Sequence, residues 1–348
     1  MELGWKPVEG MPAVLTKGEC MICVYVDDLL AAGPDAELET CWQEIRKEFP
    51  AEEPADATEF LGAEISRTTN SISISMKDYV SEIVRAFHKE FPDAPKIRQT
   101  CVPMVDALAH DAEQTKPQRR VQKLVGMLLW MGRNIRPDIA YAVSRLGTRV
   151  TKWDKKAEAE LARVVQYLDQ TKGARLVMKV GDGVKYHDMS VRTYSDANLA
   201  YPASQSGQFT CIIGPETLVP LSWRCKKQGL CVDSSGASEI IAAHQAVRDA
   251  LAYTEGINSA ILRTSQPMKL FVDNSSVIRN ARRGNSPGLD WLKLAIKLRI
   301  GLLKDLTDLG LLNVDYVNTL ENKADCLSKA MQRLKLAEHC KLMGLELA

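Results

Sequence analysis

The chain has 348 residues, a formal net charge of +1 and 45% hydrophobic residues. Its length is too great for one ordinary core and predicts two or three domains, and its apolar content is sufficient to build real cores. A net charge near zero argues neither for nor against a polyanionic partner, because only local clusters of charge can decide that question.

The cysteines and the termini indicate the cellular compartment. Nine cysteines are present, and Cys23, Cys211, Cys231 and Cys326 lie in apolar runs without histidine-rich partners. We interpret them as buried, reduced thiols with no zinc site. No signal-peptide pattern and no run of membrane-spanning length is found. We therefore expect an intracellular protein, cytoplasmic or nuclear, with no membrane partner.

The first informative run is 21–33, where apolar and β-branched residues flank Asp27 and Asp28. In a β-hairpin these acids would lie at the turn, where Asp is well tolerated. For the pair alone we favour such a turn, and metal binding stays open. Apolar periodicity then predicts amphipathic helices over 37–49 and 79–91, with short strands near Ile65 and 72–74 between them.

A helical module with clustered basic residues is predicted next. The stretch 97–116 contains Pro103 and has mixed polarity, which predicts a linker at a domain boundary. Helical patterns follow over 119–131, 137–150 and 155–171. The basic cluster suits contact with a phosphate backbone, although a solvated helical face explains it equally well. Its candidate nucleic-acid-binding residues are Arg133, Arg136 and Arg145.

From residue 184 the pattern changes to short strands followed by alternating helices and strands. Strands are predicted over 191–195, 208–213, 218–224, 268–272 and 312–317, and helices over 236–255, 275–283, 289–309 and 322–331. This α/β element order resembles that of the RNase H fold, a mixed sheet flanked by helices. The last residues, to Ala348, are expected to form a helical tail.

Four acids are carried by four of these elements. They are Asp196, Glu239, Asp273 and Asp325. Four oxygen donors on one face of a sheet are what a pair of hard cations such as Mg²⁺ requires, and such pairs clamp an in-line phosphodiester displacement. Each acid alone is more often a cap, a turn residue or a solvated group, whereas the four in this order favour a metal site.

Longer segments resemble the Pol polyproteins of Ty1/copia-type retrotransposons. Tyr25-Val26-Asp27-Asp28 resembles the YxDD box of reverse transcriptases, and Phe60-Leu61-Gly62-Ala63-Glu64-Ile65 the FLGxEI segment that follows it. The helical module carries Arg136-Pro137-Asp138-Ile139-Ala140-Tyr141, which is similar to the RPDIAY segment of that branch. The C-terminal part resembles its RNase H domain through Tyr194-Ser195-Asp196, Ser222-Trp223-Arg224-Cys225-Lys226-Lys227-Gln228, Val272-Asp273-Asn274 and Lys323-Ala324-Asp325-Cys326-Leu327-Ser328-Lys329.

The resemblance implies a domain order and an activity. It implies a partial reverse transcriptase palm over 1–95, a helical thumb or connection over 96–183, an RNase H-like domain over 184–335 and a tail over 336–348. The four acids would be catalytic and would hold two Mg²⁺ ions, for which Mn²⁺ can substitute, to cut the RNA strand of RNA–DNA hybrids. Asp27 and Asp28 would be metal ligands of the palm. Lys226, Lys227, Ser235, Asn274, Arg282 and Arg283 would join the nucleic-acid-binding set.

The same resemblance implies limits and partners. Only 26 residues precede Asp27, which is too few for the fingers and the third metal-binding Asp of a polymerase. We therefore expect DNA polymerase activity only in an intact longer polyprotein, and we expect residues 1 to about 95 to be unstable in isolation. The expected partners are an RNA–DNA hybrid or template-primer and the upstream part of the same polyprotein, in a virus-like particle or the nucleus.

Two departures from the family leave an alternative open. The family's Lys-His-Ile-Asp run is replaced by Leu294, Ala295, Ile296 and Lys297, and the loop after Asp196 is shorter than usual. A non-catalytic nucleic-acid-binding or structural relic of a decayed transposon is therefore the rival interpretation. A cellular RNase H ranks last, because the Tyr25-Val26-Asp27-Asp28 box has no reason to exist there.

Overall fold

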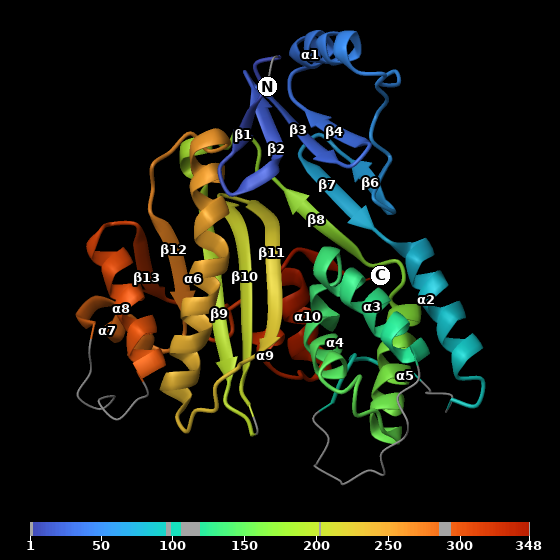
Figure 1. Ribbon diagram of the computed structural model, residues 1–348, viewed down its shortest axis with the longest axis vertical. Helices are drawn as coiled ribbons and strands as arrows, with labels where there is room; N and C mark the ends of the chain where they lie inside the picture. Colours follow the sequence, from blue (N-terminus) through green and yellow to red (C-terminus); the bar gives the residue numbers. More distant parts are fainter. Residues whose placement is uncertain (1–2, 95–98, 106–118, 202, 285–293, 348) are drawn as a thin grey trace.

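Two sheets and their helices form the α/β fold in Figure 1, a computed structural model that describes residues 3–94, 99–105, 119–201, 203–284 and 294–347. One sheet has ten strands and mixed direction, and the other has four antiparallel strands. In the described part of the chain, no helix has both the length and the apolar character that crossing a bilayer requires.

The four-stranded sheet lies at the N-terminus and packs on one helix. Trp5, Cys20 and Ile22 meet Cys41 and Ile45 in a small buried cluster. Residues 26 and 27 form the hairpin turn, since Tyr25 pairs directly with Asp28; the predicted turn at this acid pair is confirmed. The first two strands carry no clear alternation and were not predicted. The elements are β1 (Lys6–Val8), β2 (Met11–Lys17), β3 (Cys20–Tyr25), β4 (Asp28–Ala32) and α1 (Asp35–Glu48).

The nine cysteines are all free. Cys20 and Cys23 have a C-x-x-C spacing, but both lie on β3, where residues three apart point to opposite faces of the sheet. They therefore do not form a thiol pair of the kind that this spacing gives in a turn. Cys231 is exposed, so the prediction that it is buried is wrong; it lies in the loop before a helix rather than in the core.

The next segment extends the large sheet and adds a group of helices. Its hairpin strands are β5 (Glu59–Phe60), β6 (Ala63–Arg67) and β7 (Ser71–Ser75), and β7 pairs with β8 (Arg175–Lys179). The helices are α2 (Lys77–Glu90), α3 (Arg119–Asn134), α4 (Ala140–Gly147) and α5 (Lys155–Gln170), with a 3-10 turn over Pro137–Ile139.

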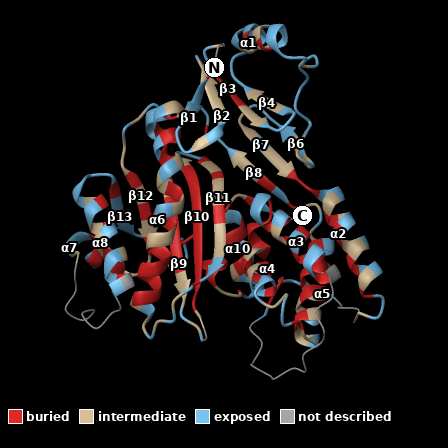
Figure 2. Ribbon diagram, in the orientation of Figure 1, coloured by how far each residue is buried: buried red, intermediate tan, exposed pale blue. Residues whose placement is uncertain are grey.

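The C-terminal half has the element order expected from the sequence. Three antiparallel strands are followed by a long helix, and the two later strands run parallel to the first one. Figure 2 shows that the central strands are buried along most of their length. The elements are β9 (Ser190–Asn198), β10 (Gln205–Gly214), β11 (Thr217–Lys227), α6 (Ser235–Ala260), β12 (Met268–Val272), α7 (Ser275–Arg283), α8 (Leu294–Asp308) and β13 (Leu312–Tyr316), after a 3-10 turn over Tyr186–Asp188.

The residues predicted to be a tail belong to the core, which corrects that expectation. Helix α9 (Asp325–Ser328) is followed by α10 (Arg333–Leu342) and by β14 (Leu345–Glu346), which pairs antiparallel with β8. Leu336, Cys340, Met343 and Leu345 are buried. β14 pairs with β8 inside the large sheet, where its backbone groups are satisfied.

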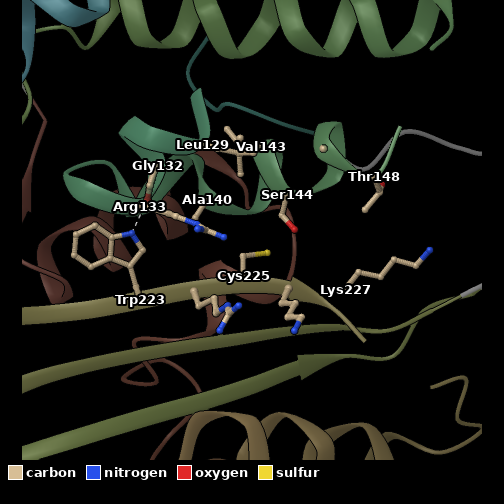
Figure 3. A pocket seen from close by; sticks show the side chains of 13 residues that line it. Leu129, Gly132, Arg133, Ala140, Val143, Ser144, Thr148, Trp223, Cys225 and Lys227 are labelled. Atoms are coloured by element: carbon tan, nitrogen blue, oxygen red, sulfur yellow. Dashed lines mark hydrogen bonds between the residues drawn. The ribbon is translucent and has the colours of Figure 1, made fainter. Parts of the chain in front are cut away.

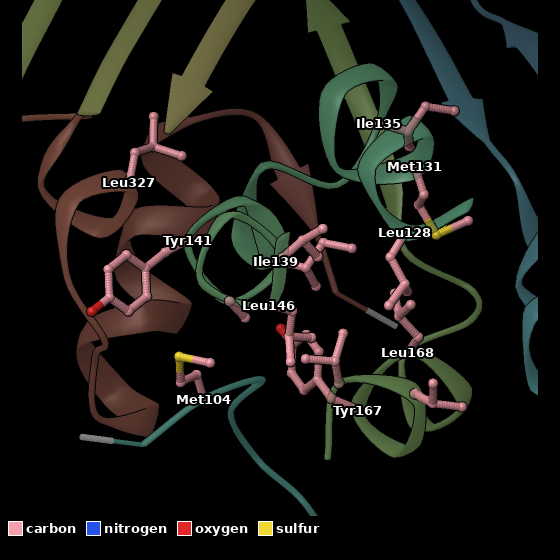
Figure 4. Packing of buried hydrophobic residues seen from close by; sticks show 14 of the residues in the cluster. Met104, Leu128, Met131, Ile135, Ile139, Tyr141, Leu146, Tyr167, Leu168 and Leu327 are labelled. Carbon is pink, nitrogen blue, oxygen red and sulfur yellow. The ribbon is translucent and has the colours of Figure 1, made fainter. Parts of the chain in front are cut away.

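One hydrophobic core crosses the predicted domain boundaries. It joins α2 to α5 with β9 to β11 and with the C-terminal helices, and Figure 4 shows Leu327 of α9 on the side of this core where Tyr141 of α4 lies. The N-terminal sheet also docks on α6, where a Cβ added at Gly10 would lie 2.2 Å from the Ala252 carbonyl oxygen. A Cβ at Gly256 would lie 2.1 Å from the Glu9 carbonyl oxygen. Only glycine allows this backbone contact.

Candidate metal centre and nucleic-acid groove

Three of the four predicted acids meet at one end of the large sheet. Asp196 lies near the end of β9, Glu239 in the first turns of α6 and Asp273 directly after β12. One carboxylate oxygen from each lies within 4.8 Å of the others. The register explains this, because β12 runs parallel to β9 with Phe271 opposite Tyr194, which brings Asp273 level with Asp196.

Burial raises the pKa of two of these acids, Asp196 and Glu239. Asp196 is 3% exposed and Glu239 is 7% exposed. Burial, and then the negative charges of Asp196 and Asp273, raise the pKa of Glu239 to about 9. Burial also raises the pKa of Asp196 to about 6, against the opposing effects of the Lys329 charge and the Ser328 hydroxyl. Metal-free, the cluster therefore retains one proton, on Glu239, at neutral pH.

The donor set fits a divalent cation. Among the described groups, Glu239 Oε2 is buried and has no hydrogen-bond partner. A buried carboxylate oxygen without a partner is costly, and a cation shared with the two neighbouring acids would satisfy it. The other two acids are held in place, since the Ser328 hydroxyl donates to Asp196 and the Thr319 hydroxyl donates to Asp273 over 2.8 Å.

The fourth predicted acid, Asp325, is not part of the three-acid cluster. It is fully buried at the start of α9 and forms ion pairs with Lys329 and, over 2.9 Å, with Lys335. His339 Nε2 lies 3.7 Å from the same carboxylate. Lys335, His339 and Thr319 also neighbour the acids but were not predicted, because no local pattern distinguishes them. Ser328 and Lys329 belong to the 323–329 segment that resembles the family, so their place beside the acids could have been predicted from it.

The metal-free protein should lose stability as the pH rises towards 9. The folded state keeps a proton on Glu239 up to about pH 9, whereas the unfolded chain releases it near 4.5. Because the folded state binds more protons in this interval, the free energy of unfolding falls by at most about 1.4 kcal/mol per pH unit. A divalent ion binds the unprotonated acids, so the increase in Tm on adding Mg²⁺ should grow over the same interval.

Thermal melts at pH 6, 7.5 and 9, with EDTA and with Mg²⁺, test this expectation. Glu239→Gln is the matched control, since it keeps the shape of the side chain but cannot titrate. The control should show a weaker pH dependence and a smaller gain with Mg²⁺. Equal slopes in the wild type and Glu239→Gln would contradict the prediction.

The predicted acids of the N-terminal hairpin lie apart from this cluster. Asp27 and Asp28 are exposed and border a cavity of 1120 Å³ that is also lined by Trp5, Ile22 and Trp42. Within the described ranges, the group of three or more metal-capable side chains is Asp196, Glu239 and Asp273 alone. The hairpin acids have no third ligand from this part of the chain.

A basic groove lies beside the acid cluster. Arg133, Lys226 and Lys227 line a groove of 420 Å³ between α3, α4 and the end of β11, shown in Figure 3. Arg145 is exposed on α4, and its charge acts on the Cys225 thiol inside the groove. Gly207 of β10 pairs with Cys225 of β11 on one side and with Asp196 of β9 on the other. Two strand spacings separate Cys225 from Asp196, roughly 10 Å, so the groove and the acids share one end of the sheet.

The prediction that Arg136 binds nucleic acid is wrong, because its guanidinium is buried. It pairs with Asp138 over 2.7 Å and donates to the carbonyl and hydroxyl of Thr171, while Tyr167 donates its hydroxyl to the same Asp138. Each guanidinium nitrogen donates to a protein group and the side chain is buried, so it cannot reach a phosphate. Arg136 follows the end of α3 and its side chain is buried, whereas Arg133 in the last turn of α3 is exposed to solvent.

The remaining predicted contacts are spread around the site. Ser235 is exposed at the start of α6, and Asn274 caps α7 by accepting the Ser276 amide over 2.9 Å. Arg282 and Arg283 are exposed in the last turn of α7. The altered run begins α8, with Leu294 and Lys297 exposed and Ile296 buried; the side chain of Ala295 lies outside the described residues.

Known proteins that this chain is similar to are a reverse transcriptase family and transposon proteins. Residues 1–100 match the family model described as reverse transcriptase (RNA-dependent DNA polymerase). The putative transposon Ty5-1 protein of Saccharomyces cerevisiae is 29% identical over 244 residues, which cover 67% of this chain and 74% of that protein. The Pol polyprotein of transposon RE1 from Arabidopsis thaliana is 23% identical over 341 residues, 95% of this chain.

This chain spans only 22% of the length of the RE1 polyprotein. Among solved structures, the N-terminal RNase H domain of a Mycobacterium tuberculosis protein covers 44% of this chain and 97% of its own length, with 13% identity and a TM-score of 0.28.

Proposed function

Because this chain is related to the Pol polyproteins of Ty1/copia-type retrotransposons, we propose that its C-terminal half is a metal-dependent endonuclease that cuts the RNA strand of RNA–DNA hybrids. The observation that carries the proposal is the convergence of Asp196, Glu239 and Asp273, with one oxygen of each within 4.8 Å of the others. Acids on two parallel strand ends and a helix start provide oxygen ligands for a hard cation.

We propose Mg²⁺ as the cation, with Mn²⁺ able to substitute. A bound divalent ion would supply a water of lowered pKa and would stabilise charge on the phosphate oxygens. The protein's own groups hold the ligands: Ser328 fixes Asp196, and Thr319 fixes Asp273. The two-ion arrangement expected from the sequence would also need Asp325 as a ligand.

The nucleic acid is proposed to run from the acids into the basic groove. Arg133, Lys226, Lys227 and the neighbouring Arg145 would bind phosphates of the hybrid, which makes binding salt-dependent. Discrimination of the RNA strand requires contacts to 2′-hydroxyl groups. Ser235 lies at the start of the helix that carries Glu239, so its hydroxyl is a candidate for such a contact. Arg282 and Arg283 would extend the basic path beyond α7.

The N-terminal match supports a second, conditional activity. We propose that residues 1–95 are the end of a reverse transcriptase palm and that DNA synthesis requires the upstream part of a longer polyprotein. That upstream part would bring a further acid to Asp27 and Asp28 and would cover the cavity beside them. Such an enzyme is expected inside the cell, in cytoplasmic virus-like particles or in the nucleus.

A relic that binds nucleic acid without cutting it is the alternative function. The observation in its favour is the burial of Asp325 against Lys329 and Lys335, which withdraws one expected ligand. The two functions differ in one measurable property, since both predict hybrid binding and only the enzyme predicts metal-dependent product.

Cleavage of a hybrid by the full chain tests the proposal. The full chain is needed because the core joins the N-terminal, helical and C-terminal parts. An end-labelled RNA–DNA hybrid is compared with RNA and DNA duplexes of the same sequence, with Mg²⁺, with Mn²⁺ and with EDTA. We expect cutting of the RNA strand of the hybrid alone, and only with a divalent ion. Folded protein that binds the hybrid without cutting it would support the relic.

A further inference from the structure

We infer that Asp325 is not a metal ligand in this chain and that the Lys329 ammonium occupies the place of a second cation, so that the nuclease site binds one divalent ion. The inference rests on the proposed nuclease function and specifies how its site is charged. Its structural basis is the difference between the three-acid cluster and the surroundings of Asp325.

Both oxygens of Asp325 already face cationic side chains. Lys329 forms an ion pair with Oδ1, one turn along from Asp325 itself. Lys335 of α10 forms an ion pair with Oδ2 over 2.9 Å, and His339 Nε2 approaches the same oxygen to 3.7 Å. Asp325 is completely buried, and a buried carboxylate is stable only when its charge is paired in this way.

Lys329 is paired with Asp325, and its charge also acts on the three-acid cluster. The charges of Asp196, Asp325 and Asp273 act on its ammonium and, against the opposing effect of burial, raise its pKa. The Oδ2 atom of Asp196 accepts the Ser328 hydroxyl from the same α9 segment. A divalent ion bridging Asp196 and Asp325 would therefore meet an ammonium at close range, and like charges in a buried site repel strongly.

The three-acid cluster has the opposite character. Among the described side chains, no lysine, arginine or histidine forms an ion pair within 4.0 Å of Asp196, Glu239 or Asp273. Neither Glu239 Oε2 nor Asp325 Oδ1 has a hydrogen-bond partner among them, but only Asp325 Oδ1 has an ion pair, with Lys329. The three acids therefore need one added cation, whereas the charge of Asp325 is already paired with the Lys329 ammonium. We therefore expect the site to contain one bound divalent ion and one fixed positive charge, that of Lys329.

Counting Mn²⁺ ions on the full chain tests this inference. Electron paramagnetic resonance of free Mn²⁺ during a titration gives the number bound and the affinity without reference to cleavage. We expect one ion per chain in the wild type, and one ion with affinity within about threefold in Asp325→Asn. Asp273→Asn, which removes a cluster acid, should weaken the ion at least tenfold. Lys329→Ala should raise the number bound from one to two.

The outcomes separate this inference from the nuclease proposal. Two ions on the wild type, or loss of the ion in Asp325→Asn, would overturn the inference and leave a metal-dependent nuclease standing. A count of one in a folded Lys329→Ala protein would show that this lysine does not exclude a second ion, which also overturns it. If the wild type binds no ion, the nuclease proposal fails with it. Thermal melts confirm folding, and the wild-type count decides if Asp325→Asn does not fold.

Discussion

Asp273→Asn should lower the rate of RNA-strand cleavage at least about 100-fold without unfolding the protein. Changes to groups behind metal ligands already cost 10- to 100-fold, and this change removes a charge from the cluster itself. Asp273 is the least buried of the three acids and follows β12 rather than forming part of it. Its amide replacement can still accept the hydrogen bond from Thr319, so the local structure should survive.

Single-turnover cleavage of the hybrid at saturating Mg²⁺ measures this effect. Asp315→Asn is the matched control, because Asp315 is an exposed acid on the neighbouring strand β13, paired in register with Phe271. The control should cleave at the wild-type rate, and both variants should bind the hybrid. Equal losses in the two variants, or full activity in Asp273→Asn, would show that cleavage does not depend on the three-acid cluster.

Elements with strong local patterns were predicted close to their observed bounds. The strand Met268–Val272 and the helix Ser275–Arg283 agree at both ends, since an apolar β-favouring run stops at Asp273 and Asn274 caps the helix that follows. Capping and burial act locally, so they are visible in the sequence. The strands Lys6–Val8 and Met11–Lys17 were missed, because Pro12 and partly exposed side chains obscure the alternation.

Long-range pairing was not predictable in the same way. Strand β14 has two residues and pairs with β8, at Leu345 and Leu176. A run this short carries no period, and its place depends on a contact between distant parts of the chain. For the same reason the sequence did not reveal that the hairpin of β6 and β7 continues the C-terminal sheet through β8.

The site shows the same division between local and tertiary signals. Asp196, Glu239 and Asp273 could be predicted together, because each lies at a recognisable boundary of a strand or helix. The environment of Asp325 could not, since Lys335 and His339 reach it from a helix expected to be a tail. Residue type also failed to separate Arg133 from Arg136, which lie three positions apart but face solvent and core respectively.

This difference predicts opposite effects for two arginine substitutions. Arg136→Ala should destabilise the protein by about 3–5 kcal/mol, because it leaves the buried Asp138 carboxylate with only the Tyr167 hydroxyl. The guanidinium also joins the end of α3 to the end of α5 through the Thr171 carbonyl, 3.0 Å away. Exposed Arg133 has no comparable buried partner among its described contacts, so Arg133→Ala should change stability by less than about 0.5 kcal/mol.

Hybrid binding should show the reverse order. Arg133 lines the basic groove, so its loss should weaken binding and reduce the slope of log affinity against log salt concentration by about 1. Arg136→Ala, measured below its melting temperature, should keep the wild-type slope. Urea unfolding and binding titrations at several salt concentrations measure the two effects. A wild-type slope in Arg133→Ala would exclude the groove from the path of the nucleic acid, and a stable Arg136→Ala protein would mean that Asp138 does not depend on its partner.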